Sequence, residues 1–194
     1  MNQHIDAIAT KLCSTCYVLR NLKYIVPLPT LRIIYYAHIH SILSYGIIFG
    51  GNSTNVNKLF ILQKKIVRIL SNIGPRDSCR KAFKKLEIMM LYSQYIFSLI
   101  LFTIDNKHLF TSNNEIHIYS TTNYTNLHMP TVNLSKFHKG PFISGIKAYN
   151  HLPQYLKLLV NDMKCFKIYH KKFLHQESFY SVKEYYEHNE NKDM

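Results

Sequence analysis

Lysine and arginine are the residues of this chain whose number and spacing point most directly to a chemical role. The 194 residues include 24 Lys and Arg against 11 Asp and Glu, for a net charge of +13. Nine of the basic residues and only two acidic ones fall within residues 58–90. A second run, residues 136–175, holds eight lysines and one aspartate. A protein this basic attracts polyanions, which predicts nucleic acid or an anionic membrane surface as its partner.

Residues that could catalyse a reaction are not gathered into a motif. Two-metal polymerase and nuclease sites need carboxylates that hold ions about 4 Å apart, but no two acidic residues here are adjacent or separated by one residue. A Walker-type phosphate loop, a Gly-x-Ser-x-Gly elbow and a His-Glu-x-x-His pair are also missing from the sequence. His38 and His40 are predicted to lie on different faces of one helix. We therefore expect no catalytic residue, metal site or cofactor in this chain.

The cysteines suggest a zinc site or a redox pair as an alternative to a chain without a chemical site. Cys13 and Cys16 have the spacing of half a zinc site or of a redox pair, but a zinc site needs a second pair of ligands. Only the single residues Cys79 and Cys165 follow, so buried thiols on an intracellular helix are predicted. The sequence opens with no signal peptide, and its most apolar run, residues 89–104, is shorter than a bilayer span. The expected location is nuclear or cytoplasmic, without secretion or membrane insertion.

Hydrophobic spacing predicts a mainly α protein. A first helix follows one apolar stripe from Ile5 to Tyr24 and ends at Pro27 and Pro29, and Thr30 caps or opens a second helix. A third helix, residues 54–70, is predicted to bury one side and to carry lysines on the other. The residues expected on its buried side are Leu59, Ile66, Val67 and Leu70.

The remaining elements complete the predicted organisation. Ser78 is the expected N-cap of a short basic helix that reaches Leu86, and an apolar helix over residues 90–106 follows. Helices are also predicted over residues 142–150 and 162–174, with one strand near residues 116–120. The predicted division is a helical bundle (1–108), an irregular polar connection (109–139), a smaller C-terminal helical segment (140–176) and a poorly ordered acidic tail (177–194). Five tyrosines at helical spacing could stack on bases but are predicted to lie in the core: Tyr35, Tyr36, Tyr45, Tyr92 and Tyr95.

Several motifs, taken in order, carry a family resemblance. The segment Tyr17–Lys23 is followed by the YYAHIHSILSYG run that starts at Tyr35, and by Gln63-Lys64-Lys65 with Arg68-Ile69. The run from Arg76 to Leu91 fits the pattern RxSCRxxFKxLxIxxL. Near the C-terminus come Gly145, Tyr149-Asn150, Leu152-Pro153 and Phe173-Leu174.

Over nearly its whole length the chain resembles the C-terminal part of non-LTR (LINE-like) retrotransposon reverse transcriptases of the Jockey type. The resemblance implies a thumb-like bundle over residues 1–108 that closes over a template–primer duplex. It also implies that the Asp-Asp motif and the Mg²⁺ used by such enzymes belong to a palm upstream of this chain. The chain departs from the family pattern at Thr121-Thr122, where the family carries Thr-Arg, and this removes one expected phosphate contact.

The leading hypothesis is a non-catalytic nucleic-acid-binding fragment of such an RNA-directed DNA polymerase. RNA, DNA or an RNA–DNA hybrid would be bound through sequence-independent phosphate contacts. The alternatives are a solvated basic surface with no such role, and an inert or protein-interaction remnant that once met the palm. The residues expected to contact phosphate are Lys58, Lys64, Lys65, Arg68, Arg76, Arg80, Lys84 and Lys85, with a second patch of Lys164, Lys167, Lys171 and Lys172.

Overall fold

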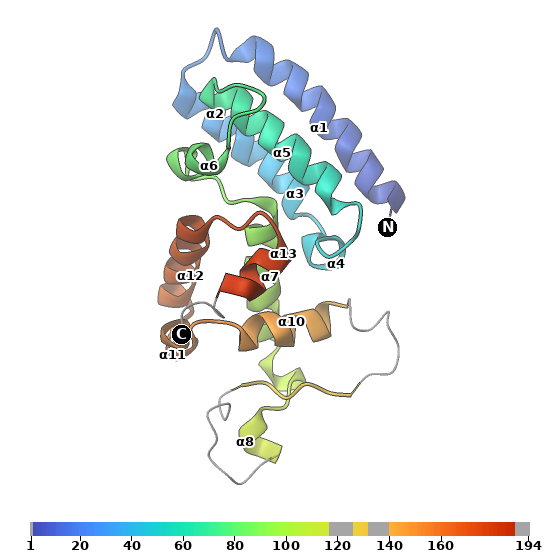
Figure 1. Cartoon of the computed structure of the whole chain (residues 1–194), viewed down its shortest axis with the longest axis vertical. Helices are drawn as coiled ribbons and strands as arrows, with labels where there is room; N and C mark the ends of the chain where they lie inside the picture. Colours follow the sequence, from blue (N-terminus) through green and yellow to red (C-terminus); the bar gives the residue numbers. More distant parts are fainter. Residues whose placement is uncertain (1, 117–125, 132–139, 189–194) are drawn as a thin grey trace. The chain divides into compact units, whose positions relative to one another are not determined.

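The computed structural model describes residues 2–116, 126–131 and 140–188, and most of these residues are helical (Figure 1). The predicted mainly α fold is confirmed. The chain divides into two compact units, Met1–Tyr95 with Leu174–Tyr180, and Ile96–Phe173 with Ser181–Met194. The division falls inside a helix, whereas the sequence suggested a boundary after residue 108.

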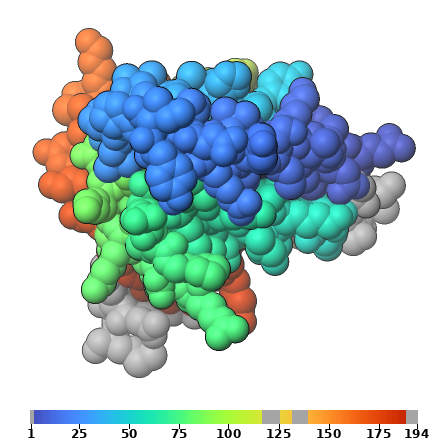
Figure 2. Space-filling model, turned by 90° about the horizontal axis from the view of Figure 1, so that it is seen from above, coloured from blue at the N-terminus to red at the C-terminus, as the bar shows by residue number. Residues whose placement is uncertain are grey.

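The first unit is organised around two long helices, α1 (Asn2–Leu22) and α5 (Val56–Ser71), which pack along each other. Figure 2 shows their residues side by side on one face. The apolar stripe of α1 is buried as predicted, from Ile5 through Leu12 to Leu19. Tyr24, which was expected to continue this stripe, is 82% exposed because the helix ends two residues earlier.

A broken helical segment follows α1. It consists of α2 (Leu28–Ile34), the π-helical turn η1 (Tyr35–His40), α3 (Ser41–Ser44) and α4 (Ile47–Gly50). The predicted start at Thr30 is wrong, because Pro27 takes the N-cap position and Pro29 sits in the first turn, where a missing N–H is tolerated. Gly46, with φ of 65°, separates α3 from α4.

The two basic helices of the first unit end in the same way. Asn72 and Glu87 take left-handed conformations after α5 and after α6 (Arg80–Leu86). Cys79, and not the predicted Ser78, occupies the N-cap position of α6, without a side-chain capping bond. The predicted buried side of α5 is confirmed, since Leu59, Ile66, Val67 and Leu70 are all buried.

Gln63 joins three segments of the first unit from a completely buried position on α5. Its amide nitrogen donates to the Tyr35 hydroxyl at 2.9 Å and to the Met89 carbonyl at 3.0 Å. Its amide oxygen accepts the Leu91 N–H at 2.9 Å, at the first residue of α7 (Leu91–Asp105). Burial also raises the pKa of the Tyr35 hydroxyl, so this group stays protonated.

The second unit contains the rest of α7, the 3₁₀ turn η2 (Lys107–Leu109), α8 (Asn113–Ile116), α10 (Pro141–Asn150), α11 (Gln154–Leu158), most of α12 (Met163–Glu177) and α13 (Val182–His188). The last turn of α12 belongs to the first unit. Helix α13 lies inside the tail that was expected to be poorly ordered. Its Tyr185 is buried, and the Tyr185 hydroxyl donates to the Ala148 carbonyl at 3.1 Å.

Two residues of α10 determine how it contacts neighbouring segments of this unit. A Cβ atom on Gly145 would lie 2.3 Å from Thr103 Oγ1 of α7, so the two helices approach closely only because of this glycine. Asn150 forms a pair of 2.8 Å hydrogen bonds, accepting the Leu127 N–H and donating to the Leu127 carbonyl. The Asn150 side chain thereby pairs with both backbone groups of Leu127, as the backbone of a neighbouring β-strand would.

The described residues contain no strand, only an isolated bridge between Ser112 and Leu127. The strand predicted near residues 116–120 lies outside the described residues, except for Ile116, which ends α8. Among the described residues, no single helix has both the length and the apolar character needed to cross a bilayer. Helices α6 and α7 meet the two criteria only when they are counted as one segment, and a bend of 58° separates them.

Candidate nucleic-acid interface

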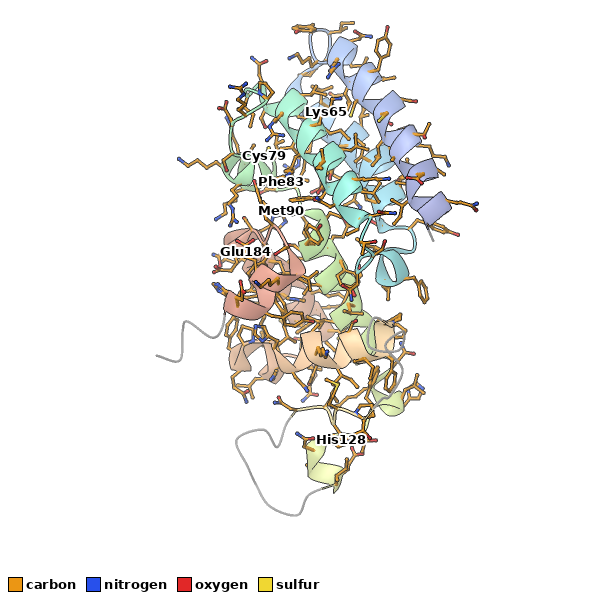
Figure 3. The ribbon with its side chains drawn as sticks, turned by 45° about the vertical axis from the view of Figure 1, so that its right-hand side comes forward. Lys65, Cys79, Phe83, Met90, His128 and Glu184 are labelled. Carbon is orange, nitrogen blue, oxygen red and sulfur yellow. The ribbon has the colours of Figure 1, made fainter. Side chains whose placement is uncertain are left out.

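The basic residues of α5 lie on both sides of its buried face. Lys58 and Lys65 are exposed, and Lys64 and Arg68, which lie nearer to α6, are half-buried. Figure 3 labels Lys65 on α5, together with Cys79 and Phe83 at α6. The amphipathic, cationic helix predicted from the sequence is therefore present, but its cations differ in what they contact.

Lys64 and Arg80 point at aromatic rings. The Lys64 ammonium lies 4.6 Å from the centre of the Phe60 ring and 5.6 Å from that of Tyr180. The Arg80 guanidinium lies 4.3 Å from the centre of the Tyr180 ring. Phe60 and Tyr180 meet edge to face at 5.3 Å. These contacts hold the end of the first unit's C-terminal segment, so both cations have a structural role.

Two further predicted residues have protein partners. An Arg68 Nη atom donates to the Asp77 carbonyl at 3.0 Å and so braces the loop between α5 and α6. Lys58 pairs with Asp6 of α1 at 3.2 Å, with both side chains exposed. Solvent screens an exposed pair of this kind, which leaves Lys58 available to a phosphate that competes for it.

Four predicted residues of the first unit remain as exposed cations: Lys65, Arg76, Lys84 and Lys85. None of them forms an ion pair with any residue that the structure describes. Sequence reasoning missed Arg20 of α1, which is also exposed and unpaired within the same ranges. Burial raises the pKa of the Cys16 thiol, and the charges of Lys65 and Arg20 act on it in the opposite direction. These two cations therefore lie within electrostatic reach of one buried sulfur.

The lysines of α12 form the second predicted patch, in the second unit. Lys164, Lys167 and Lys171 are spaced by three and four residues, which places them on one helical face, and all three are exposed. Lys172 is exposed on a neighbouring face, and the Lys171 ammonium lies 5.5 Å from the centre of the Phe97 ring. Asp162 begins the helix by accepting the N–H groups of Lys164 and Cys165 at 3.0 and 3.1 Å.

Tyr180 is the residue of this region that sequence reasoning could not find. It lies 100 residues beyond Arg80 and 116 residues beyond Lys64 in the sequence, in a segment expected to be a poorly ordered tail. The tyrosines named from helical spacing also differ from expectation. Tyr35 and Tyr95 are buried and Tyr92 is half-buried, but Tyr36 and Tyr45 are exposed.

Residues that suggested metal or redox chemistry are not assembled in the described residues. No three His, Cys, Asp or Glu side chains there gather closely enough to hold a metal ion. Cys16 is buried, but the prediction that its partner is buried too is wrong, because Cys13 is exposed. Two of the histidines scattered in the predicted polar connection, His117 and His138, lie outside the described residues.

An open groove in the first unit has a volume of about 770 Å³. It is lined mainly by apolar side chains of α2 and η1, and by the end of α6. Arg32 and Lys85 provide its charged atoms, and Arg32 pairs with Glu87.

Comparison with known proteins found no matching family model, no matching curated protein and no matching solved structure. The function is therefore inferred from the residues themselves.

Proposed function

We propose that this chain is a non-catalytic nucleic-acid-binding segment that contacts the phosphate backbone of RNA, DNA or an RNA–DNA hybrid. The observation that supports it is that four of the cations predicted to contact phosphate in the first unit are exposed and have no carboxylate partner among the described residues: Lys65, Arg76, Lys84 and Lys85. No ion pair within the described ranges uses their charge. Like charges held together on α6 and its neighbours repel one another, so a bound polyanion relieves that repulsion.

Contacts of this kind carry no sequence information, because phosphates are the same at every nucleotide. Their contribution to affinity comes from the release of counterions condensed on the nucleic acid. Lys58 and the lysines of α12 add to the count of possible contacts. Lys64, Arg68 and Arg80, by contrast, position the helices, and we remove them from the set of primary phosphate contacts.

The family resemblance extends this proposal. In a reverse transcriptase of the non-LTR type, such a segment would act as the clamp over the template–primer duplex. The palm that holds Mg²⁺ and performs synthesis would then be a partner domain. The order and spacing of the Gln63-Lys64-Lys65 run and the run from Arg76 to Leu91 support this reading.

The proposal is tested by two charge-matched triple variants. Lys65, Lys84 and Lys85 are replaced by Gln in one variant, and the exposed Lys11, Lys107 and Lys147 in the other. Binding to a labelled 20-base-pair RNA–DNA hybrid is measured between 50 and 200 mM salt by fluorescence anisotropy. Each lost phosphate contact lowers the slope of log K against log salt by about 0.9. We expect the first variant to lose about 2 to 3 units of slope and the second to retain the original slope. Equal losses in both variants, or wild-type binding that is independent of salt, would contradict the proposal.

The second candidate function is a protein-interaction remnant, and the open apolar groove favours it. Ile33, on the rim of this groove, is 67% exposed. If the groove once met a palm domain, the isolated chain should self-associate and a co-expressed palm fragment should restore a monomeric, soluble complex. Size-exclusion chromatography with light scattering distinguishes this outcome from a monomer that binds nucleic acid.

A further inference from the structure

Two tyrosines, one in the C-terminal part of α1 and one just after its end, are largely exposed to solvent. Tyr17 is 69% exposed and Tyr24 is 82% exposed. Tyr17 forms no hydrogen bond or ring contact with any described residue, and the only such contact of Tyr24 is with the neighbouring Lys23. Among the described residues, no hydrogen bond or ring contact with another element of the fold uses either ring.

A basic residue lies next to each of the two tyrosine rings. Arg20 follows Tyr17 by three residues, which places it on the same exposed helical face. The Lys23 ammonium lies 4.9 Å from the centre of the Tyr24 ring and donates to Asn72 Oδ1, just after α5, at 3.1 Å. Helix α1 packs along α5, and Arg20 and Lys65 are both near enough to the Cys16 sulfur for their charges to act on it, so Lys65 lies on the neighbouring helix within reach of the same strand.

Negative charge is lacking on this part of α1. The only carboxylate in the helix is Asp6, which is 14 residues from Arg20 and is already paired with Lys58. At 1.5 Å per residue this separation is about 21 Å. The surface formed by Tyr17, Arg20, Lys23 and Tyr24, called here the α1 strip, is therefore both aromatic and cationic.

We propose that the α1 strip binds single-stranded nucleic acid, with unpaired bases stacked on Tyr17 and Tyr24 and phosphates next to Arg20, Lys23 and Lys65. Bases inside a duplex already stack on their neighbours and are inaccessible to a protruding ring, whereas every unpaired base offers its face. Tyr24 lies seven residues after Tyr17 and two residues beyond the end of α1, so the bases of one short strand can reach both rings.

This inference rests on the proposed function and narrows it. Phosphate contacts alone would not distinguish a duplex from a single strand, whereas base stacking favours the single strand. In the setting of a template–primer clamp, the strip would bind the unpaired template or a displaced strand.

The chain has no tryptophan, so a single substitution creates a unique reporter. Tyr24→Trp is titrated with a 12-nucleotide single strand and with a blunt-ended duplex of the same sequence. Tyr45→Trp is the matched control, because Tyr45 is 76% exposed and lies beside His4 at the opposite end of α1. We expect the single strand to quench the emission of the Tyr24→Trp variant and not that of the Tyr45→Trp variant.

Affinity measurements complete the test. The double variant Tyr17→Ala with Tyr24→Ala should lose at least about tenfold in affinity for the single strand, with duplex affinity and the salt slope unchanged. The double variant Tyr17→Phe with Tyr24→Phe keeps the ring faces and should bind like the wild type. Circular dichroism of each variant confirms that the helices are retained.

The outcomes separate this inference from the proposed function. If the double alanine variant binds the single strand like the wild type while salt-dependent binding persists, the α1 strip is not a stacking site and the phosphate contacts stand. If it loses duplex and single-strand binding equally, the preference for unpaired bases is wrong. If the wild type binds neither form, both proposals fail. A spectral change of the Tyr24→Trp variant with protein concentration alone would identify the strip as a self-association surface and overturn the inference.

Discussion

Among the described residues, each unit of the molecule has a large polar side chain that is completely buried, and the two side chains differ in their hydrogen bonding. Gln63, in the first unit, uses its amide in three hydrogen bonds to two other segments and to the start of α7. His170, in the second unit, makes no hydrogen bond through either ring nitrogen to any described residue. Its ring instead lies 5.3 Å from that of Phe97 and 5.2 Å from that of Phe166.

The difference shows that burial of a polar group does not by itself reveal its role. The Gln63 amide supplies hydrogen bonds to the Met89 carbonyl and the Leu91 N–H, which lie between helices. Its removal leaves those buried groups without a partner. The His170 imidazole packs as an aromatic ring, and burial lowers its pKa to about 3, which keeps it neutral in the folded protein. Gln63 supplies hydrogen bonds. His170 fills space in the core as a neutral ring, and its contribution to stability depends on pH.

Replacement of Gln63 by leucine should have the largest effect on stability. The Tyr35 hydroxyl, the Met89 carbonyl and the Leu91 N–H would each lose a partner in the core, at about 1 to 3 kcal/mol for each group. We expect urea denaturation to show a loss of at least about 3 kcal/mol in the free energy of unfolding. Asn57→Leu is the matched control, since Asn57 is exposed on the same helix and should change stability by less than about 0.5 kcal/mol. A Gln63→Leu variant as stable as the control would refute the assigned role.

The pH dependence of the free energy of unfolding tests the role assigned to His170 in the second unit. His170 has a pKa of about 3 when folded and about 6.5 when unfolded. The unfolded chain therefore binds the extra proton as pH falls below about 6.5, and stability is lost from there down to pH 3. His170→Phe retains an aromatic ring and cannot be protonated.

The variant should gain stability relative to the wild type as pH falls, by about 1.6 kcal/mol between pH 6.5 and pH 5. Urea denaturation of both proteins across this range measures the difference, in which the carboxylates common to both chains cancel. A difference that stays constant with pH would mean that the imidazole is already protonated, or is solvated, in the folded protein.

The sequence predicted the helices well because most of them repeat apolar residues at the helical period. The buried face of α5 and the stripe of α1 are examples. Helix ends were predicted less well where two signals competed. At the start of α2, proline in the first turn outweighed the hydroxyl of Thr30, and Cys79 was preferred to Ser78 at α6.

The candidate site was predictable only as a set of charges. Spacing identified the basic helices, but it did not separate Lys84, which is exposed, from Arg80, which lies against Tyr180. That distinction depends on a contact between residues 100 apart in the sequence, and helical periodicity carries no information at that range. Tyr24 was assigned to the buried stripe for the same reason, since the pattern continued past the residue where α1 ends.

Asn150 provides the intermediate case, because its amide is only half-buried and joins backbone groups in the second unit. Replacement by alanine removes both hydrogen bonds to Leu127, but Lys157 still donates to Asn126 Oδ1 at 2.7 Å and holds the neighbouring residue. The free energy of unfolding should fall by about 1 to 2 kcal/mol, less than for Gln63→Leu. Hydrogen exchange should show lost protection at the Leu127 amide ahead of any loss in α10. Asn161→Ala, at an exposed position of the same unit, is the control. If Asn150→Ala destabilises the protein as much as Gln63→Leu does, full burial is not what separates the two amides, and the number of bonds lost cannot be used to rank polar side chains in this fold.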